Sequence, residues 1–275
     1  MELLVFDLDG TLLDGRGRLS ARTTATLLAL RRSGIAYTVA TGRTFQECRG
    51  LLGALEIGLP QIYANGVVVW DPVLARFTQQ CFLTPPEVER TITAALQTNL
   101  SPLVHTIDPT HHHAVYHPPI KDELLDRWTR TFEAELGLEL RPLPRLPADA
   151  DITNIFMLGD GAAITHVHDQ IDAQDHLVAY GGEASESPGW RWLDVHHTNA
   201  SKGKALRFLK QQMAVSRVVC FGDADNDLSL FAQADESYAP ANATASAKAA
   251  ATAVIAHHNE DGVAEFLRHR YALDR

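Results

Sequence analysis

Cysteine is scarce in this chain of 275 residues, and long apolar runs are absent. The three cysteines cannot all pair with one another, which favours a reducing compartment such as the cytoplasm. No stretch reaches the roughly 18 uncharged apolar residues that a membrane-spanning helix needs. The first residues also lack the basic segment of an export signal. We therefore expect a soluble, cytoplasmic protein without a membrane segment.

Basic charge is also in short supply. Lysine and arginine number 24 against 34 aspartates and glutamates, so the formal net charge is −10. This balance argues against a nucleic-acid interface or a membrane-binding face, because both need clustered cations. The hydrophobic share of 45% and the charged share of 21% are those of a globular protein, which excludes disorder. A small anionic partner would therefore need a locally positive pocket. The sequence does not indicate a protein partner.

Alternating strand and helix patterns predict an α/β fold with a doubly wound parallel sheet. Short apolar runs at 3–6, 35–40 and 217–221 read as strands buried on both faces. Helices are expected after each of them, with Ser20 and Thr44 as N-caps. Right-handed crossovers bring all strand-to-helix loops to one edge of such a sheet, so polar residues there should share one site.

The middle of the chain follows a different order. From 82 to 182 the patterns give a helix, two strands, a helix, two strands, a helix and a strand. We interpret this block as an α+β domain inserted into the first, which leaves 1–81 and 183–275 as the core. Asn65-Gly66 before the block is a hairpin signal, and an alanine-rich helix is expected at 241–253.

Two carboxylates follow the first strand in Asp7-Leu8-Asp9-Gly10. If the strand geometry persists, Asp7 and Asp9 point to the same side, and so close a pair implies a bound cation or a shared proton. An aspartate-rich turn is the plain alternative. An EF-hand is excluded, because its glycine belongs at loop position six rather than four.

A second acidic segment, Asp223-Ala224-Asp225-Asn226-Asp227, follows the strand expected at 217–221. Its oxygens suit a hard divalent cation. The alternative is a solvated helix start, because Asn226 and Asp227 also fit a first helical turn.

Two further segments could hold an anion. Thr41-Gly42-Arg43 offers a hydroxyl and backbone amides at a helix start, where phosphate oxygens bind. Lys202 lies in the first turn of another helix, where a cation opposes the helix dipole. An anion therefore explains Lys202 better than helix stability does, and Lys204 is the competing candidate.

In chain order, the four segments resemble the four motifs of the haloacid dehalogenase superfamily, and more narrowly the Cof-type phosphatases. The resemblance extends to Ala64-Asn65-Gly66 and to the tail, where Asn242-Ala243, Lys248 and the segment 259–264 match. It covers the core, whereas the block 82–182 matches in layout only. It implies a phosphatase acting on a small phosphorylated metabolite, such as a sugar phosphate, with 82–182 as a substrate-specificity cap.

The resemblance also implies roles for individual residues. Asp7 would be the nucleophile that forms an aspartyl-phosphate, Asp9 the general acid and base, and Lys202 a stabiliser of the transferring oxygens. Thr41, Gly42, Arg43 and Asn226 would contact the phosphate or substrate. Mg²⁺ would be held by the Asp7 carboxylate, the Asp9 carbonyl, Asp223 and Asp227.

Two other activities fit the same core. A phosphomutase would return the phosphoryl group to substrate rather than to water, and a non-catalytic sensor would only bind a phosphorylated ligand. The intact Asp7, Asp9, Lys202 and Asp223 argue against the sensor.

A histidine cluster in the middle block has two readings, a zinc site or an exposed cap strand or loop that contacts substrate. In an extended strand His111 and His113 would share one face and His112 the other. No cysteine or carboxylate spacing completes a zinc site, which favours the second reading. Gly159-Asp160-Gly161 imitates the fourth motif but is expected to be a turn. The cluster consists of His105, His111, His112, His113 and His117.

Overall fold

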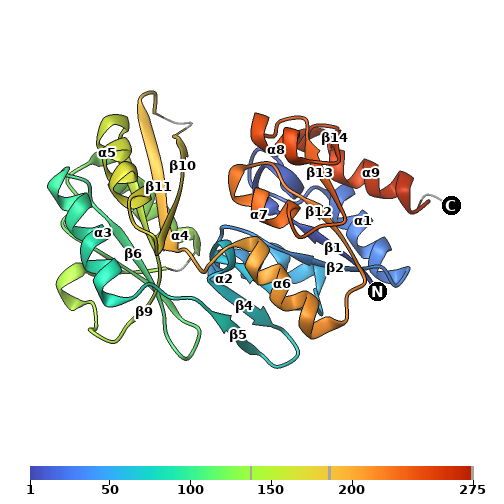
Figure 1. The fold of residues 1–275 in the computed structure, drawn as a ribbon, viewed down its shortest axis with the longest axis horizontal. Coiled ribbons are helices and arrows are strands. Elements are labelled where there is room, and N and C mark those ends of the chain that lie inside the picture. Colours follow the sequence, from blue (N-terminus) through green and yellow to red (C-terminus); the bar gives the residue numbers. More distant parts are fainter. Residues whose placement is uncertain (137, 185–186, 274–275) are drawn as a thin grey trace. The chain divides into compact units, whose positions relative to one another are not determined.

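The computed structural model describes residues 1–136, 138–184 and 187–273, and the chain divides into two compact units. The first joins Met1–Gln80 to Ala200–Arg275, and the second is Cys81–Asn199 (Figure 1). The expected end of the insertion at 182 is wrong. Strand β11 (Trp190–His197) pairs with β10 (Leu177–Glu183) and β9 (Asp151–Asp160), so it belongs to the second unit.

The first unit is built on a five-stranded sheet in the order β14-β13-β12-β1-β2. Every neighbouring pair in this sheet is parallel. The strands are β1 (Glu2–Phe6), β2 (Ala36–Val39), β12 (Arg217–Phe221), β13 (Glu236–Pro240) and β14 (Ala253–Ile255). The predicted parallel sheet is confirmed, and β1 lies between β2 and β12.

Helices cover both faces of this sheet because successive strand residues point to opposite sides. Leu3 and Val5 pack in one cluster with apolar residues of α6 (Lys202–Met213) and α7 (Leu228–Phe231). On the other face the ring of Phe221 lies 5.8 Å from that of Phe266 in α9 (Gly262–Arg270). Helix α1 (Ala21–Arg32) packs beside α9. The doubly wound α/β fold is therefore confirmed.

Local signals set the helix ends. The Ser20 side chain accepts a hydrogen bond from the Thr23 amide at the start of α1, and Gly34 follows that helix with φ 74°. Thr44 and Glu47 form a capping box at the start of α2 (Phe45–Leu52). The expected helix at 241–253 is wrong in extent. Only α8 (Ala245–Ala250) is helical, because the chain turns extended at Ala251 to add β14 to the sheet edge.

A second, smaller sheet in this unit joins β3 (Gln61–Tyr63), β4 (Val68–Asp71) and β5 (Arg76–Gln80) in antiparallel order. The hairpin expected at Asn65-Gly66 is present, but its turn is a short 3-10 segment that includes Ala64. Both Ala64 and Asn65 have positive φ, at 47° and 54°.

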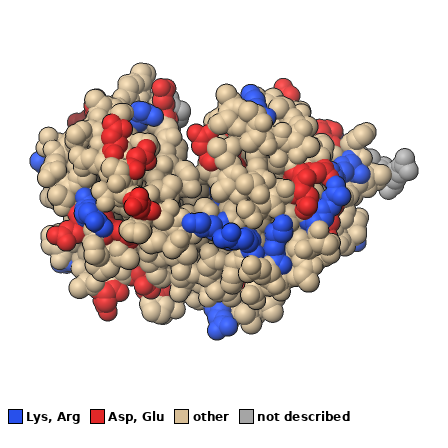
Figure 2. Space-filling model, in the orientation of Figure 1, with Lys and Arg blue, Asp and Glu red and all other residues tan. Residues whose placement is uncertain are grey.

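Charged side chains of both signs are interspersed over the visible surface of the first unit (Figure 2). Glu236, for example, pairs with Arg217 and Arg270. Hydrogen bonds from Arg270 and Tyr238 hold the pKa of the Glu236 carboxyl well below its usual range. Among the described residues, no helix has both the length and the apolar character needed to cross a membrane.

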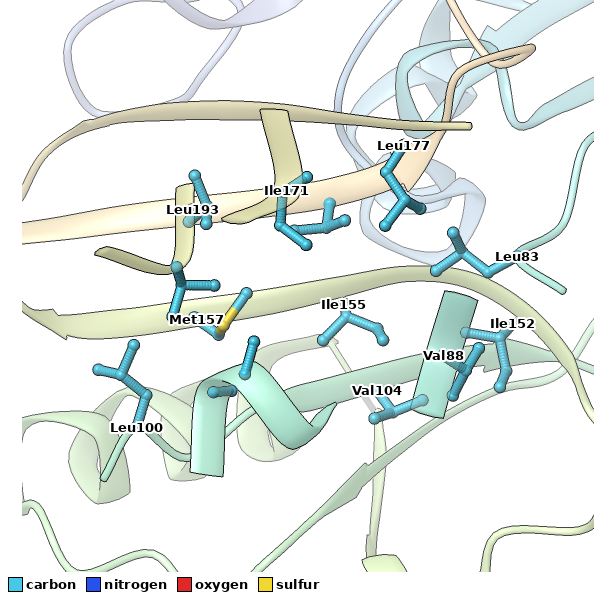
Figure 3. Packing of buried hydrophobic residues seen from close by; sticks show 14 of the residues in the cluster. Leu83, Val88, Leu100, Val104, Ile152, Ile155, Met157, Ile171, Leu177 and Leu193 are labelled. Carbon is cyan, nitrogen blue, oxygen red and sulfur yellow. The ribbon is translucent and has the colours of Figure 1, made fainter. Parts of the chain in front are cut away.

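The second unit contains a six-stranded sheet in the order β10-β11-β9-β6-β7-β8, antiparallel except for β7 and β8. Helices α3 (Pro85–Gln97) and α5 (Gly161–Asp172) pack on one face, where Val104, Ile155 and Met157 lie in the core (Figure 3). Helix α4 (Glu123–Leu136) packs on the other face through Leu125. The remaining strands are β6 (Leu103–Ile107), β7 (His113–His117) and β8 (Glu139–Pro142).

Two details of this unit differ from expectation. Asp160 ends β9 and caps α5 by accepting hydrogen bonds from the Ala162 and Ala163 amides at 3.0 and 3.2 Å, so it is a helix cap rather than a free turn. His111 has φ 65° and lies with His112 before β7 begins. The expected alternation of His111, His112 and His113 along one strand is therefore wrong.

Two histidines of the cluster are buried inside the unit. His105 on β6 and His113 on β7 share one face of the sheet. Burial lowers the pKa of His105 to about 4 and that of His113 to about 3. Neither ring nitrogen of His113 has a hydrogen-bond partner among the described residues.

These two histidines predict an acid-sensitive second unit. Their pKa values lie below the ordinary value of 6.5, so between about pH 6.5 and 4 the unfolded chain binds protons that the folded chain does not. Above pH 6.5 these histidines do not lower the free energy of unfolding. Below pH 6.5 each of them lowers it by up to about 1.4 kcal/mol per pH unit. We expect the free energy of unfolding, measured by chemical denaturation from pH 7 to 4.5, to fall less steeply with pH in the double variant His105→Gln, His113→Gln. The exposed His166→Gln is the control, and an equal slope in both variants would contradict the prediction.

Candidate active site

Polar residues gather at the carboxyl edge of the central parallel sheet. Asp7 directly follows β1, and its amide donates to the Phe221 carbonyl at 2.9 Å, which ties the ends of β1 and β12 together. Asp223 comes two residues after β12, and Thr41 two residues after β2. Because these strands are neighbours, three of the four sequence motifs meet at one edge.

Lys202, in the first turn of α6, belongs to the remaining motif, the third in chain order. Its ammonium nitrogen lies 2.6 Å from Asp7 Oδ1 and 2.7 Å from Asp227 Oδ1. Lys202 is 1% exposed, and both carboxylates are buried. Lys204, the competing candidate, is exposed. A buried cation therefore joins the first and fourth motifs.

The second oxygen of Asp227 fixes the loop that carries Asp223. Asp227 Oδ2 accepts hydrogen bonds from the amides of Asp223 at 2.9 Å and Ala224 at 3.2 Å. A Cβ on Gly222 would lie 2.5 Å from Asp227 Cγ, so the loop can approach this carboxylate only with glycine there. Asp227 thus positions both Lys202 and Asp223.

The charges of this group do not balance. Carboxylate oxygens of Asp7, Asp223 and Asp227 all lie within 4.8 Å of one another, and they are the one such group among the described residues. Three carboxylates and one ammonium leave a formal charge of −2 when all are ionised. Burial, with the neighbouring carboxylates, raises the pKa of Asp7 well above its usual range and that of Asp223 to about 7. A group of oxygen ligands with an excess negative charge of this size fits a divalent cation such as Mg²⁺.

Asp9 lies in different surroundings from Asp7. Its two oxygens accept hydrogen bonds from Arg43 Nε at 2.7 Å and Nη2 at 2.6 Å, and its side chain is 56% exposed. The two carboxylates have different partners, Lys202 for Asp7 and Arg43 for Asp9. The strand ends at Phe6, so its alternation does not extend to the pair.

The segment Thr41-Gly42-Arg43 connects this edge to α2. Thr41 is buried, and its hydroxyl oxygen accepts a hydrogen bond from the Arg43 amide at 3.1 Å. Arg43 itself pairs with Asp9, rather than standing free for an anion. A Cβ on Gly42 would lie 3.3 Å from the Asn65 side-chain amide, which is a close approach.

Asn65 lies among these residues, although the sequence analysis gave it only as part of a hairpin signal and of the family resemblance. The Asn65 side-chain oxygen accepts a hydrogen bond from Asn226 Nδ2 at 2.9 Å. The Asn65 backbone N–H donates to the Thr41 carbonyl at 2.9 Å. Asn65 is buried, which joins the second and fourth motifs. Asn226, expected to contact the phosphate or substrate, uses its side-chain nitrogen for the bond to Asn65, and its side-chain oxygen has no hydrogen-bond partner among the described residues. The Asn-Gly dipeptide was the available signal, but it is equally typical of an ordinary hairpin.

A family model described as haloacid dehalogenase-like hydrolase matches residues 4–267 of the chain. The chain belongs to this family. The match includes all four motifs, and the resemblance drawn from them is confirmed. Relatives along the whole chain carry the name phosphatase, so the expectation of a phosphatase is confirmed as well.

Three similar proteins show how completely the chain is matched. An HMP-PP phosphatase from Enterobacter sp. (strain 638) is 29% identical, over 97% of this chain and 94% of that protein. A pyridoxal phosphate phosphatase from Escherichia coli (strain K12) is 26% identical, over 96% of this chain and 97% of its own length. A solved haloacid dehalogenase-like hydrolase from B. subtilis has a TM-score of 0.79 at 25% identity, covering 98% of this chain and 99% of that one. Both units of the chain are therefore included in these matches.

Removing the buried ammonium should destabilise the first unit. Lys202→Met leaves two buried carboxylates unpaired, and breaking such a pair costs about 3–5 kcal/mol. Denaturant unfolding in a chelating buffer at pH 8 measures this loss. Lys204→Met, on the exposed side of the same helix, is the matched control and should change stability by about 0.5 kcal/mol or less. Equal stabilities of the two variants would show that the buried pair contributes nothing.

Proposed function

We propose that this phosphatase hydrolyses a small phosphorylated metabolite, such as a sugar phosphate, with Mg²⁺ and through a phosphoryl group carried on Asp7. The observation that carries the proposal is the buried contact of Lys202 with Asp7 and Asp227, beside Asp223. A carboxylate held by a fixed cation at the edge of a sheet is suited to attack phosphorus.

The chain's own residues account for the proton transfers. Asp7 attacks phosphorus, and Asp9 gives a proton to the leaving oxygen. Asp9 then takes a proton from water, which attacks the phosphoryl group on Asp7 and releases inorganic phosphate. Lys202, the Thr41 hydroxyl and the amides before α2 stabilise negative charge on the transferring oxygens. Asp9 must release Arg43 from one oxygen to act, which leaves the guanidinium available to the substrate.

The Asp7 and Asp223 carboxylates and the Asp9 carbonyl would hold the Mg²⁺, with Asp227 completing the shell directly or through water. The ion would keep Asp7 ionised and reduce repulsion between its carboxylate and the phosphate dianion. The raised pKa values of Asp7 and Asp223 without a metal support this assignment.

The second unit, Cys81–Asn199, would act as the cap that selects the substrate. None of the residues assigned to chemistry belongs to it. The two relatives described above match both units of the chain and are named for different compounds, which fits a family whose members differ in substrate. The histidine cluster belongs to this unit. Only the three aspartates of the core form a group suited to a metal among the described residues. His105 and His113 are buried inside the unit, so only His111, His112 and His117 are left as candidates for substrate contact.

A phosphate-release screen over some tens of phosphorylated metabolites tests the activity. Release should require Mg²⁺ and disappear with a chelator, and Asp7→Asn should fall to background while its melting curve stays cooperative. Undiminished turnover by Asp7→Asn would refute Asp7 as the nucleophile. A phosphomutase would instead need a bisphosphate for turnover, and a sensor would bind phosphorylated ligands without releasing phosphate.

Asp9→Asn tests the acid and base. This change keeps the backbone carbonyl but removes the exchangeable proton, so kcat/KM should fall by about 10² to 10⁴. The loss should be larger for phenyl phosphate than for 4-nitrophenyl phosphate, because the more basic leaving group depends more on protonation. Mg²⁺ affinity, measured by calorimetry, should change little. A large loss of Mg²⁺ binding with unchanged turnover would reverse the assignment.

A further inference from the structure

The loop after Asp9 is fastened by a distant part of the chain. We call the segment from Asn242 to Asp261 the C-terminal strap. Asn242 Nδ2 donates to the Gly10 carbonyl at 2.7 Å, although the two residues are 232 positions apart. Further along the strap, His258, Asn259 and Asp261 form hydrogen bonds with Leu13, Gly15 and Ser20 of the loop and with Thr23 in the first turn of α1. Among these bonds, only that of Asn242 reaches the residue next to Asp9.

Gly10 is the point where this loop is most constrained. Its φ of 73° lies in the left-handed region, and a Cβ there would lie 2.2 Å from Asp223 Oδ2. The backbone of Gly10 is therefore packed against a proposed metal ligand. Because Gly10 directly follows Asp9, the bond that holds the Gly10 carbonyl restrains the backbone immediately after Asp9.

The orientation of the Asn242 side chain follows from its two partners. The Gly10 carbonyl can only accept, so the side-chain nitrogen must face it. The His258 backbone amide can only donate, and Asn242 Oδ1 accepts from it at 3.2 Å. An amide satisfies both partners, whereas a carboxylate would place one oxygen against the Gly10 oxygen.

The same turn also reaches the metal loop. The Thr244 amide donates to the Asp223 carbonyl at 2.8 Å. The turn that carries Asn242 therefore bonds to both loops that supply the proposed chemistry. The bond to Asp223 fixes the position from which Asn242 holds Gly10.

We propose that Asn242 is a positioning residue. By holding the Gly10 carbonyl it keeps Asp9 at the place from which it exchanges protons with the leaving oxygen and with water. This inference rests on the proposed function, because it requires Asp9 to be the acid and base. A purely structural strap would stabilise the fold without any dependence on Asp9.

A double-mutant cycle separates these two roles. The variants are Asn242→Ala, Asp9→Asn and the double variant, with kcat/KM measured for phenyl phosphate and 4-nitrophenyl phosphate. Residues that orient a reacting group typically contribute 10- to 100-fold, so Asn242→Ala should cost about that factor for phenyl phosphate and about threefold or less for 4-nitrophenyl phosphate. In the Asp9→Asn background the same change should cost less than about threefold.

Two further variants act as controls. Asn242→Asp keeps the acceptor for the His258 amide but loses the donor to Gly10, so it should lose at least as much activity as Asn242→Ala. Asn259→Ala removes the strap's 2.6 Å bond from the Gly15 amide and should leave kcat/KM within about threefold. Melting temperatures should fall by no more than about 4 °C in each variant. If Asn242→Ala melts lower than this, the kcat/KM of Asn242→Asp, which keeps the acceptor for the His258 amide, is the test instead.

The inference is overturned if the losses of Asn242→Ala and Asp9→Asn multiply in the double variant, or if Asn259→Ala loses as much as Asn242→Ala. Either result leaves the phosphatase assignment intact. If Asp9→Asn alone keeps full activity, the proposed role of Asp9 fails, and the inference fails with it.

Discussion

The structure of the first unit depends on one ammonium group held between two buried carboxylates. Lys202 lies on α6, Asp7 after β1 and Asp227 beyond β12, so a single contact set joins three segments that are distant in sequence. Burying these charges is costly unless all are present together, because each desolvated ion needs its partner. The arrangement therefore exists only when the parallel sheet has brought the ends of β1 and β12 side by side.

The same requirement explains the supporting residues. Asp227 uses its other oxygen on the amides of its own loop, and Asn226 reaches across to Asn65, which in turn holds Thr41 through the backbone. Asp227 thus has partners for both of its oxygens, which fix the direction of its side chain. Such fixed dipoles and charges need little rearrangement when a phosphate arrives.

Much of this was predictable because the motifs stand at the ends of apolar strands. The parallel sheet, the caps at Ser20 and Thr44 and the choice of Lys202 over Lys204 follow from local patterns. Long-range partners do not: nothing in the sequence around Asn65 or Asn242 indicates which distant group each one binds. Strand β11 was missed as part of the insertion because its pairing with β9 and β10, rather than its composition, assigns it to the second unit.

The insertion of the second unit into the first has a consequence for how the chain folds. The second unit is one continuous segment, Cys81–Asn199, so all its strand partners emerge from the ribosome before the first unit can be completed. Strand β1 can pair with β2 early but with β12 only after the second unit, and the Met1 amino group bonds to Ser216, 215 residues away. Contacts of such separation slow folding. We therefore expect β1 to pair with β2 early and to remain without its second neighbour, β12, until the whole second unit has been synthesised.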